Sequence, residues 1–201
     1  MKLSFKASHH REEGTNFLQV EEPFRFESGG SIPAVTLAYE TWGELDDERS
    51  NAVLILTGLS PNAHAASNED NPSDGWWEPM IGPGKAIDTN RHYVICVNSL
   101  GSCQGSTGPG CVNPETGKQY RLSFPDLVIA DISKTAAMVL EYLGIEQLRA
   151  LIGPSMGGMS CLALLQQNPE VSRHFLAIST AARAEPFAIA VRSLQREIIV
   201  R

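Results

Sequence analysis

The sequence of 201 residues predicts an α/β fold built on a mostly parallel sheet. Short, continuous runs of apolar residues recur along the chain, as in strands that are buried on both faces. In the second half these runs alternate with segments of helical period, as in βαβ units. The length suits one domain with a sizeable core, and neither a linker nor an internal repeat divides the chain. We therefore expect residues 1–201 to belong to one domain.

Six strands are expected along the chain. Residues 17–20 and the alternating run 34–39 predict an antiparallel opening hairpin. Continuous apolar runs are typical of the buried strands of a parallel sheet, and they occupy the ranges 52–56, 93–97, 149–152 and 175–178.

Three helices accompany these strands. Residues 131–143 carry apolar side chains at helical spacing, and Gly144 is placed to end that helix in a left-handed cap. Residues 156–167 form a helix directly after the fifth strand, and Asn168-Pro169 ends it. Residues 189–201 are helix-like and reach the last residue without a capping signal.

Two long segments, residues 57–91 and 99–125, are rich in Gly, Pro, Asn and Ser and show no clear period. Long irregular segments in a compact domain are usually functional, because ordering them costs entropy. Both follow expected strands, so we expect them at the carboxyl edge of the sheet, where open α/β proteins bind ligands.

Composition excludes several classes of function. A net charge of −7 argues against nucleic acid or an anionic membrane surface as partner. No run of 18 apolar residues and no secretory apolar core occurs, so we expect a cytoplasmic protein. The four cysteines, interpreted as reduced thiols, lack the spacing of a metal site, and no metal is expected. They are Cys96, Cys103, Cys111 and Cys161.

A nucleophile elbow is the strongest local signal. The segment Gly153-Pro154-Ser155-Met156-Gly157 has the pattern G-x-S-x-G between an apolar strand and a helix. Small residues on either side allow the sharp turn that would expose the Ser155 hydroxyl. The Met156 amide at the helix start would stabilise an oxyanion. Alternatively, the glycines only permit close packing of strand and helix.

A second oxyanion donor is expected where another buried strand ends. Leu54-Ile55-Leu56-Thr57-Gly58 is such a place, and we assign the Leu56 amide to this role. A backbone role leaves no side-chain signature, so an ordinary exit from a strand remains the alternative.

Further motifs extend the pattern over nearly the whole chain from about residue 30. They are Asn98-x-x-Gly101-x-Cys103-x-Gly105-Ser106-Thr107-Gly108-Pro109, Asn113-Pro114-x-Thr116-Gly117-Lys118, Phe124-Pro125, Trp76-Trp77, residues 81–89, Gly157-Gly158-Met159 and Thr180-Ala181-Ala182-Arg183. With these motifs the sequence resembles the homoserine O-acetyltransferase family of the α/β-hydrolase superfamily.

The resemblance implies an α/β-hydrolase fold and transfer of an acyl group from acyl-CoA to the hydroxyl of a small amino acid, as in cysteine or methionine biosynthesis. Ser155 would carry the acyl group in a ping-pong reaction. Acyl-CoA would be a co-substrate with no bound cofactor, the substrates would be small molecules, and the complete protein would be a homodimer. The segments 57–91 and 99–125 would wall a tunnel that excludes water.

Two departures from the family pattern bear on the acyl donor. The Leu-Thr-Gly turn continues as Leu59-Ser60-Pro61-Asn62-Ala63-His64 instead of Asp-Ser-His, and Pro154 stands where Gly is usual. Both features resemble the branch that uses succinyl-CoA, in particular serine O-succinyltransferases, and acetyl-CoA remains the alternative. The candidate substrate-binding residues are Gly58, Leu59, Ser60, Pro61, Arg183 and Arg196.

The roles of three side chains are left open. Arg183 and Arg196 could hold a carboxylate, or they could be solvated or ion-paired helix residues. His64 could line the pocket, although a loop histidine is more often at the surface.

A base for the serine is missing. A serine nucleophile needs a histidine oriented by a carboxylate, yet no aspartate follows Ser155. His174 is the only later histidine and precedes its strand, at the wrong end of the sheet. We therefore expect an incomplete domain that lacks its lid, acid and base, and that is nearly inactive by itself. An esterase, or a relic domain that binds a partner or ligand, are the alternatives.

Overall fold

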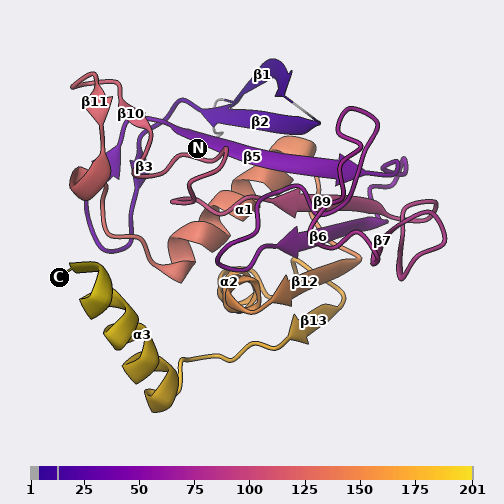
Figure 1. Ribbon diagram of the computed structural model, residues 1–201. Helices are drawn as coiled ribbons and strands as arrows, with labels where there is room; N and C mark the ends of the chain where they lie inside the picture. Colours follow the sequence, from indigo (N-terminus) through magenta and orange to yellow (C-terminus); the bar gives the residue numbers. More distant parts are fainter. Residues whose placement is uncertain (1–4, 13, 201) are drawn as a thin grey trace.

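The computed structural model describes residues 5–12 and 14–200, with the side chains of residues 14–199. Its main element is a seven-stranded sheet (Figure 1). In spatial order the strands are β1 (Phe5–Glu12), β2 (Thr15–Val20), β5 (Val35–Trp42), β9 (Tyr93–Val97), β6 (Ala52–Leu56), β12 (Ala150–Pro154) and β13 (Phe175–Ile178). The last four are parallel to one another, whereas β1, β2 and β5 pair in antiparallel fashion. The expected parallel sheet with an antiparallel opening is confirmed.

The amino-terminal part of the chain, before β6, contains more strands than the sequence suggested. Between β2 and β5 lies a small two-stranded sheet of β3 (Phe24–Arg25) and β4 (Ser31–Ile32). The edge strand β1 was not predicted, because its residues are mostly charged and polar. Edge strands commonly carry charges, which oppose pairing with other chains, so an apolar pattern does not reveal them.

Alternate residues of the central strands serve two separate cores. Leu54 and Leu56 of β6 face the core that includes side chains of α1 (Ile129–Leu143) and α2 (Met156–Gln167). Val53 and Ile55 face the opposite core. There the sheet is covered by residues 57–91, which contain the short strands β7 (Ile81–Gly82) and β8 (Ile87–Asp88).

The ends of α1 follow from its sequence. It begins at Ile129, two residues earlier than expected, because the carboxylate of Asp131 accepts a hydrogen bond from the Val128 N–H at 3.0 Å and caps the helix. At the other end Gly144 has φ 67°, in the left-handed region expected of its cap.

The remaining elements follow the expected order. Helix α2 ends at Gln167 with Asn168 as its C-cap, as expected. Helix α3 (Pro186–Val200) begins earlier than residue 189, at a proline suited to a first helical turn. Residues 99–125 contain the hairpin of β10 (Val112–Asn113) and β11 (Lys118–Gln119) and a 3₁₀ turn at Arg121–Ser123.

The carboxyl ends of β6, β9, β12 and β13 meet at one edge of the sheet, since these strands run in the same direction. The segments 57–91 and 99–125 therefore leave the sheet beside the elbow, as expected, and the hydroxyls of Thr57 and Ser99 lie 3.3 Å apart there. Helix α3 lies away from the sheet, beyond the end of β13 (Figure 1). Within the described chain, no helix has both the length and the apolar character needed to cross a membrane.

Candidate active site

Ser155 occupies a strained turn between β12 and α2. Its φ of 54° and ψ of −123° lie in a region that L-residues rarely adopt, at a cost of about 1–3 kcal/mol. Two hydrogen bonds hold this turn. The Ser155 N–H donates to the carbonyl of Ile178 at 2.9 Å, and the Gly158 N–H donates to the carbonyl of Ser155 at 3.1 Å. The side chain is exposed at the carboxyl edge of the sheet.

The neighbouring glycines allow backbone contacts that a side chain would prevent. A Cβ on Gly157 would lie 1.9 Å from the carbonyl oxygen of Leu56, and one on Gly153 would lie 2.5 Å from the Cα of Gly158. The elbow therefore packs α2 directly against the ends of β12 and β6. This is the geometry that the G-x-S-x-G pattern predicts.

Both predicted oxyanion donors lie next to this turn. Met156 is the first residue of α2, and the first N–H groups of a helix have no partner within it. Leu56 is the last residue of β6, and its carbonyl contacts the position of Gly157. Their assignment as oxyanion donors remains a prediction, supported by this proximity.

The predicted substrate-binding residues 58–61 are only partly gathered at the serine. A Cβ on Gly58 would lie 3.9 Å from the Cβ of Ser155, so this backbone borders the nucleophile. Pro61 packs against Gly58, because its Cδ lies 3.7 Å from the position that such a Cβ would take. Leu59 is 66% exposed, and Ser60 is also exposed.

A cavity of about 560 Å³ opens beside Ser155; we call it the serine cavity. Arg183 and Arg196, both predicted from the sequence, lie in its wall. So does Arg192, which the sequence analysis missed, although its spacing of four residues from Arg196 places both on one face of α3. Glu185 is the acidic residue of this wall.

The expected tunnel between segments 57–91 and 99–125 is absent from the serine cavity, which is lined by the elbow, residues 179–185 and α3. Residues of both segments instead line a second cavity of about 710 Å³, together with β2 and β5; we call it the histidine cavity.

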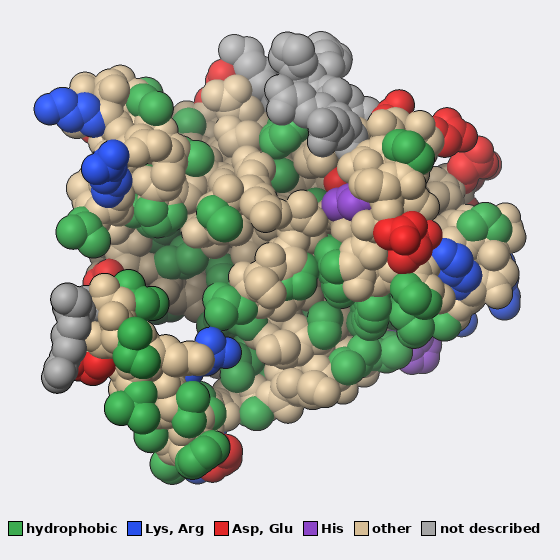
Figure 2. All heavy atoms as spheres, in the orientation of Figure 1, with side chains coloured by type: hydrophobic (Ala, Val, Ile, Leu, Met, Phe, Trp, Pro, Cys, Tyr) green, Lys and Arg blue, Asp and Glu red, His purple; other side chains and the backbone are tan. Residues whose placement is uncertain are grey.

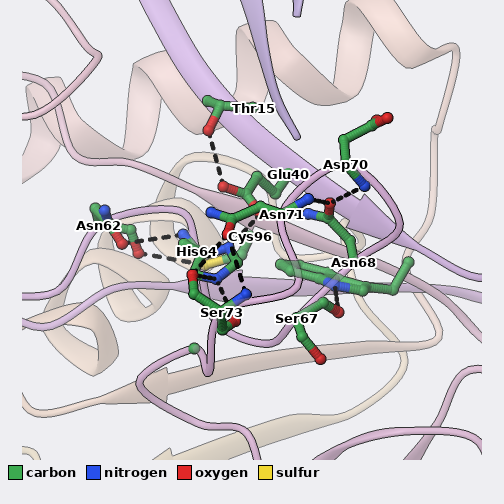
Figure 3. Close-up of polar contacts among 12 residues, drawn as sticks. Thr15, Glu40, Asn62, His64, Ser67, Asn68, Asp70, Asn71, Ser73 and Cys96 are labelled. Carbon is green, nitrogen blue, oxygen red and sulfur yellow. Dashed lines mark hydrogen bonds and ion pairs between the residues drawn. The ribbon is translucent and has the colours of Figure 1, made fainter. Parts of the chain in front are cut away.

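His64 lies in the wall of the histidine cavity, with 12% of its side chain exposed. Its Nδ1 is 2.9 Å from a carboxylate oxygen of Glu40, which is 1% exposed, and its Nε2 is 2.9 Å from the carbonyl oxygen of Ser73. Thr15 and Asn68 donate further hydrogen bonds to the same carboxylate (Figure 3). Of the two alternatives left open for His64, the structure favours a cavity wall over the surface, although this cavity is not the one beside Ser155. A carboxylate 24 positions earlier in the chain holds the ring there.

Opposing effects act on the pKa of His64. Burial lowers it, but the hydrogen bonds to Glu40 and Ser73 and the charges of Glu40 and Glu78 outweigh burial and raise the pKa above 6.5. Both ring nitrogens face acceptors, so the doubly protonated imidazolium satisfies both contacts. His64 is thus engaged through both ring nitrogens, by Glu40 and by Ser73.

None of the histidines among residues 14–199 is hydrogen-bonded to Ser155. His92 and His174 precede β9 and β13, at the amino edge of the sheet. Ser155 bonds to Ile178, at the opposite end of β13 and about 13 Å of strand away from His174. The rejection of His174 as the base agrees with this placement.

The four cysteines are free thiols. Burial raises the pKa of Cys161 to about 12 and that of Cys96 well above its usual value, so neither thiol is suited to act as a nucleophile. No cluster of metal ligands occurs among the described residues.

Comparison with known proteins identifies the family. A family model described as "alpha/beta hydrolase fold" matches residues 51–195, well over half of the chain. The chain belongs to the α/β-hydrolase family. The strand order, the elbow and the exposed serine described above agree with this membership.

Curated relatives of this α/β-hydrolase chain are named serine O-succinyltransferase. The protein of Xanthomonas axonopodis pv. citri is 60% identical over 186 residues, which are 92% of this chain and 46% of that protein. The protein of Stenotrophomonas maltophilia is 57% identical over 92% of this chain and 50% of its own length. The chain spans about half the length of the curated relatives it matches.

Solved structures of similar fold include a homoserine O-acetyltransferase and an esterase. Homoserine O-acetyltransferase from Bacillus anthracis has a TM-score of 0.81 at 34% identity, over 86% of this chain and 48% of its own. Esterase E22 has a TM-score of 0.80 at 36% identity, over 88% of this chain and 50% of its own. The resemblance to the homoserine O-acetyltransferase family, and within it to serine O-succinyltransferases, is confirmed.

Proposed function

We propose that the whole protein is an O-acyltransferase that moves a short acyl group, preferably succinyl, from acyl-CoA to the hydroxyl of L-serine or L-homoserine. The observation that carries this proposal is the exposed Ser155 at a nucleophile elbow beside a cavity that presents three arginines. The names of the relatives, which are amino-acid O-acyltransferases, support it. Such a reaction would supply O-acyl amino acids for cysteine or methionine synthesis.

The reaction would proceed in two half-reactions. The Ser155 oxygen attacks the thioester carbon, the C–S bond breaks, and the CoA thiol leaves with the proton of the serine hydroxyl. The hydroxyl of the amino acid then attacks the acyl-serine ester, and its proton returns to the Ser155 oxygen. The amides of Met156 and Leu56 would stabilise the oxyanion in both steps. No resident cofactor is required, because the thioester already activates the acyl group.

Proton transfer in both steps needs a base that residues 14–199 do not bring to Ser155. The three histidines in this range are held by Glu40 or lie at the amino edge of the sheet. We propose that the part of the whole protein outside these 201 residues supplies a histidine and its carboxylate partner.

The arginines of the serine cavity support carboxylate-bearing substrates. A guanidinium fork matches the planar carboxylate of an amino acid or of a succinyl group. In our proposal Arg183 and Arg196 bind such carboxylates, while Gly58 and its neighbours to Pro61 shape the acyl site beside the serine. Acetyl-CoA is the alternative donor, since one solved neighbour is a homoserine O-acetyltransferase.

The test is a kinetic comparison with the whole protein. Release of CoA is measured with succinyl-CoA and acetyl-CoA, each with serine, with homoserine and with water alone. We expect the highest kcat/KM with succinyl-CoA and release that depends on the amino acid. A higher kcat/KM with acetyl-CoA would overturn the preference for succinyl.

Hydrolysis is the second candidate function, because esterase E22 has a similar fold at 36% identity. Turnover of simple esters at equal rates with and without an amino acid would favour this function. Under the proposed transferase, turnover should instead depend on the amino acid, because its hydroxyl accepts the acyl group.

A further inference from the structure

Arg192 is a charged residue of the serine cavity for which the reaction above has assigned no role. It lies on α3, in the cavity wall that also contains Ser155. Its Nη1 donates to the side-chain oxygen of Gln195 over a long 3.4 Å. Within side chains 14–199, ion pairs join His64 to Glu40 and Lys85 to Glu78, and none involves an arginine of this cavity.

The cavity therefore concentrates positive charge in a protein whose net charge is −7. Arg183, Arg192 and Arg196 line it, against the single carboxylate of Glu185. Arg192 and Arg196 are four residues apart on one helix face, an arrangement of like charges that is unfavourable without an anion. Figure 2 shows a basic side chain beside the hollow between α3 and the rest of the molecule. The excess of two positive charges suits two carboxylates better than one.

The side chains next to Arg192 on α3 indicate which carboxylate it binds. Ala188 and Ile189 precede Arg192 by four and three residues and line the same cavity, so an apolar surface leads to the guanidinium. A succinyl ester on Ser155 has two methylene groups followed by a carboxylate about 5 Å from the ester oxygen. Such an acyl group combines an apolar and a charged part, as this wall does. An acetyl group has nothing to present to Arg192.

We propose that Arg192 binds the free carboxylate of a dicarboxylic acyl group carried on Ser155, and that it thereby determines the acyl donor. This inference rests on the proposed acyl-serine intermediate and specifies how succinyl is distinguished from acetyl. Arg183 and Arg196 are then left for the carboxylate of the amino acid, and Glu185 for its ammonium group.

The experiment compares variants of the whole protein with both donors. Arg192→Gln removes the charge. Arg192→Lys keeps the charge but lacks the paired N–H donors of the guanidinium group. Arg173→Gln is the matched control, because Arg173 also donates to a glutamine, Gln147, but lines a different cavity with Glu48 and Gly144. For each variant kcat and KM are measured for succinyl-CoA and acetyl-CoA at saturating amino acid, and for the amino acid at a saturating concentration of each donor. Acylation of Ser155 is followed by intact mass.

We expect Arg192→Gln to lower kcat/KM for succinyl-CoA about 10- to 100-fold, the usual effect of losing a charged hydrogen bond. With acetyl-CoA the change should stay within about twofold, and Arg192→Lys should recover part of the succinyl activity. Arg173→Gln should change kcat/KM for neither donor. Because Arg192 is exposed, its replacement should leave the melting temperature unchanged.

Two results would overturn this assignment while leaving the proposed function standing. An equal loss with both donors would show that Arg192 binds the CoA phosphates or supports the fold. A raised KM for the amino acid with both donors would place Arg192 at the acceptor carboxylate. If the unaltered protein transfers no acyl group from either donor, the proposed function fails and this inference fails with it.

Discussion

Ser155 combines a strained backbone with an exposed hydroxyl, which is the arrangement of a nucleophile and not of a packing residue. Its φ of 54° is held by hydrogen bonds to Ile178 and Gly158. We predict that Ser155→Ala in the whole protein abolishes acyl-enzyme formation and lowers kcat by about 10⁴-fold or more. Intact mass after mixing with acyl-CoA measures the first effect. Ser172→Ala, whose hydroxyl bonds to the His174 carbonyl, is the control and should acylate normally; an acylated Ser155→Ala protein would contradict the assignment.

His64 provides a second prediction at the residue scale, and it concerns stability. Its pKa is raised above 6.5 in the folded state, so its contribution is complete below about pH 6.5 and is lost as the pH rises through the folded-state value. We predict that His64→Gln lowers the free energy of unfolding by about 1–3 kcal/mol near pH 6 and by less near pH 9.

Urea denaturation of both proteins at the two pH values measures this difference. His174→Gln is the control, because its side chain is exposed and distant from Glu40. A loss that is independent of pH would show that the ring of His64 acts through packing alone.

At the scale of elements, the contact between α2 and β6 depends on one missing side chain. A Cβ at position 157 would lie 1.9 Å from the Leu56 carbonyl oxygen and 2.8 Å from that of Thr57. We predict that Gly157→Ala destabilises the protein by about 1–3 kcal/mol or more, because this overlap exceeds the gain of about 1 kcal/mol in helix propensity.

Thermal unfolding measures this loss, and Gly110→Ala is its control, since a Cβ there has no neighbour within 4 Å. Equal melting temperatures for the two variants would mean that the strand and helix can separate at no cost. The same displacement moves Leu56 and Met156 apart, so acylation of Ser155 should slow in Gly157→Ala.

The elements that the sequence predicted are those with a strong local signal. The apolar run 52–56, the amphipathic helix closed by Gly144 and the elbow at Ser155 each satisfy a rule that acts within a few residues. The strand β1 and the pair β7 and β8 were missed because they lack an apolar run: β1 is mostly charged and polar, and β7 and β8 have two residues each.

The candidate site likewise contains residues that a local pattern predicts and residues that only the fold brings together. The nucleophile and its glycines could be predicted, since strand, turn and helix are consecutive in the chain. The pairing of His64 with Glu40 joins residues 24 positions apart on different elements, and neither residue alone indicates it. Arg192 became distinguishable from other exposed arginines only when the structure placed it with Ser155 around one cavity.

At the scale of the whole molecule, the described chain presents a nucleophile without a base. No histidine among residues 14–199 is bonded to Ser155, and His64 is committed to Glu40 and Ser73. The side of α3 away from the serine cavity is also exposed and apolar, with Phe187 81% and Ile198 78% exposed. Full burial of this helix therefore requires more than these residues supply, and we expect the same of catalysis.

This deficit leads to a prediction about the 201 residues by themselves. We predict that they bind substrates weakly and turn over at least about 10³-fold more slowly than the whole protein, the usual effect of removing a histidine base while the nucleophile and oxyanion donors remain. CoA release at matched concentrations of the two proteins measures the ratio. Covalent labelling of Ser155 by a fluorophosphonate checks the cause, because such probes also need the serine to be activated. If the 201 residues matched the whole protein in rate, a base within this chain would have to reach Ser155 during catalysis.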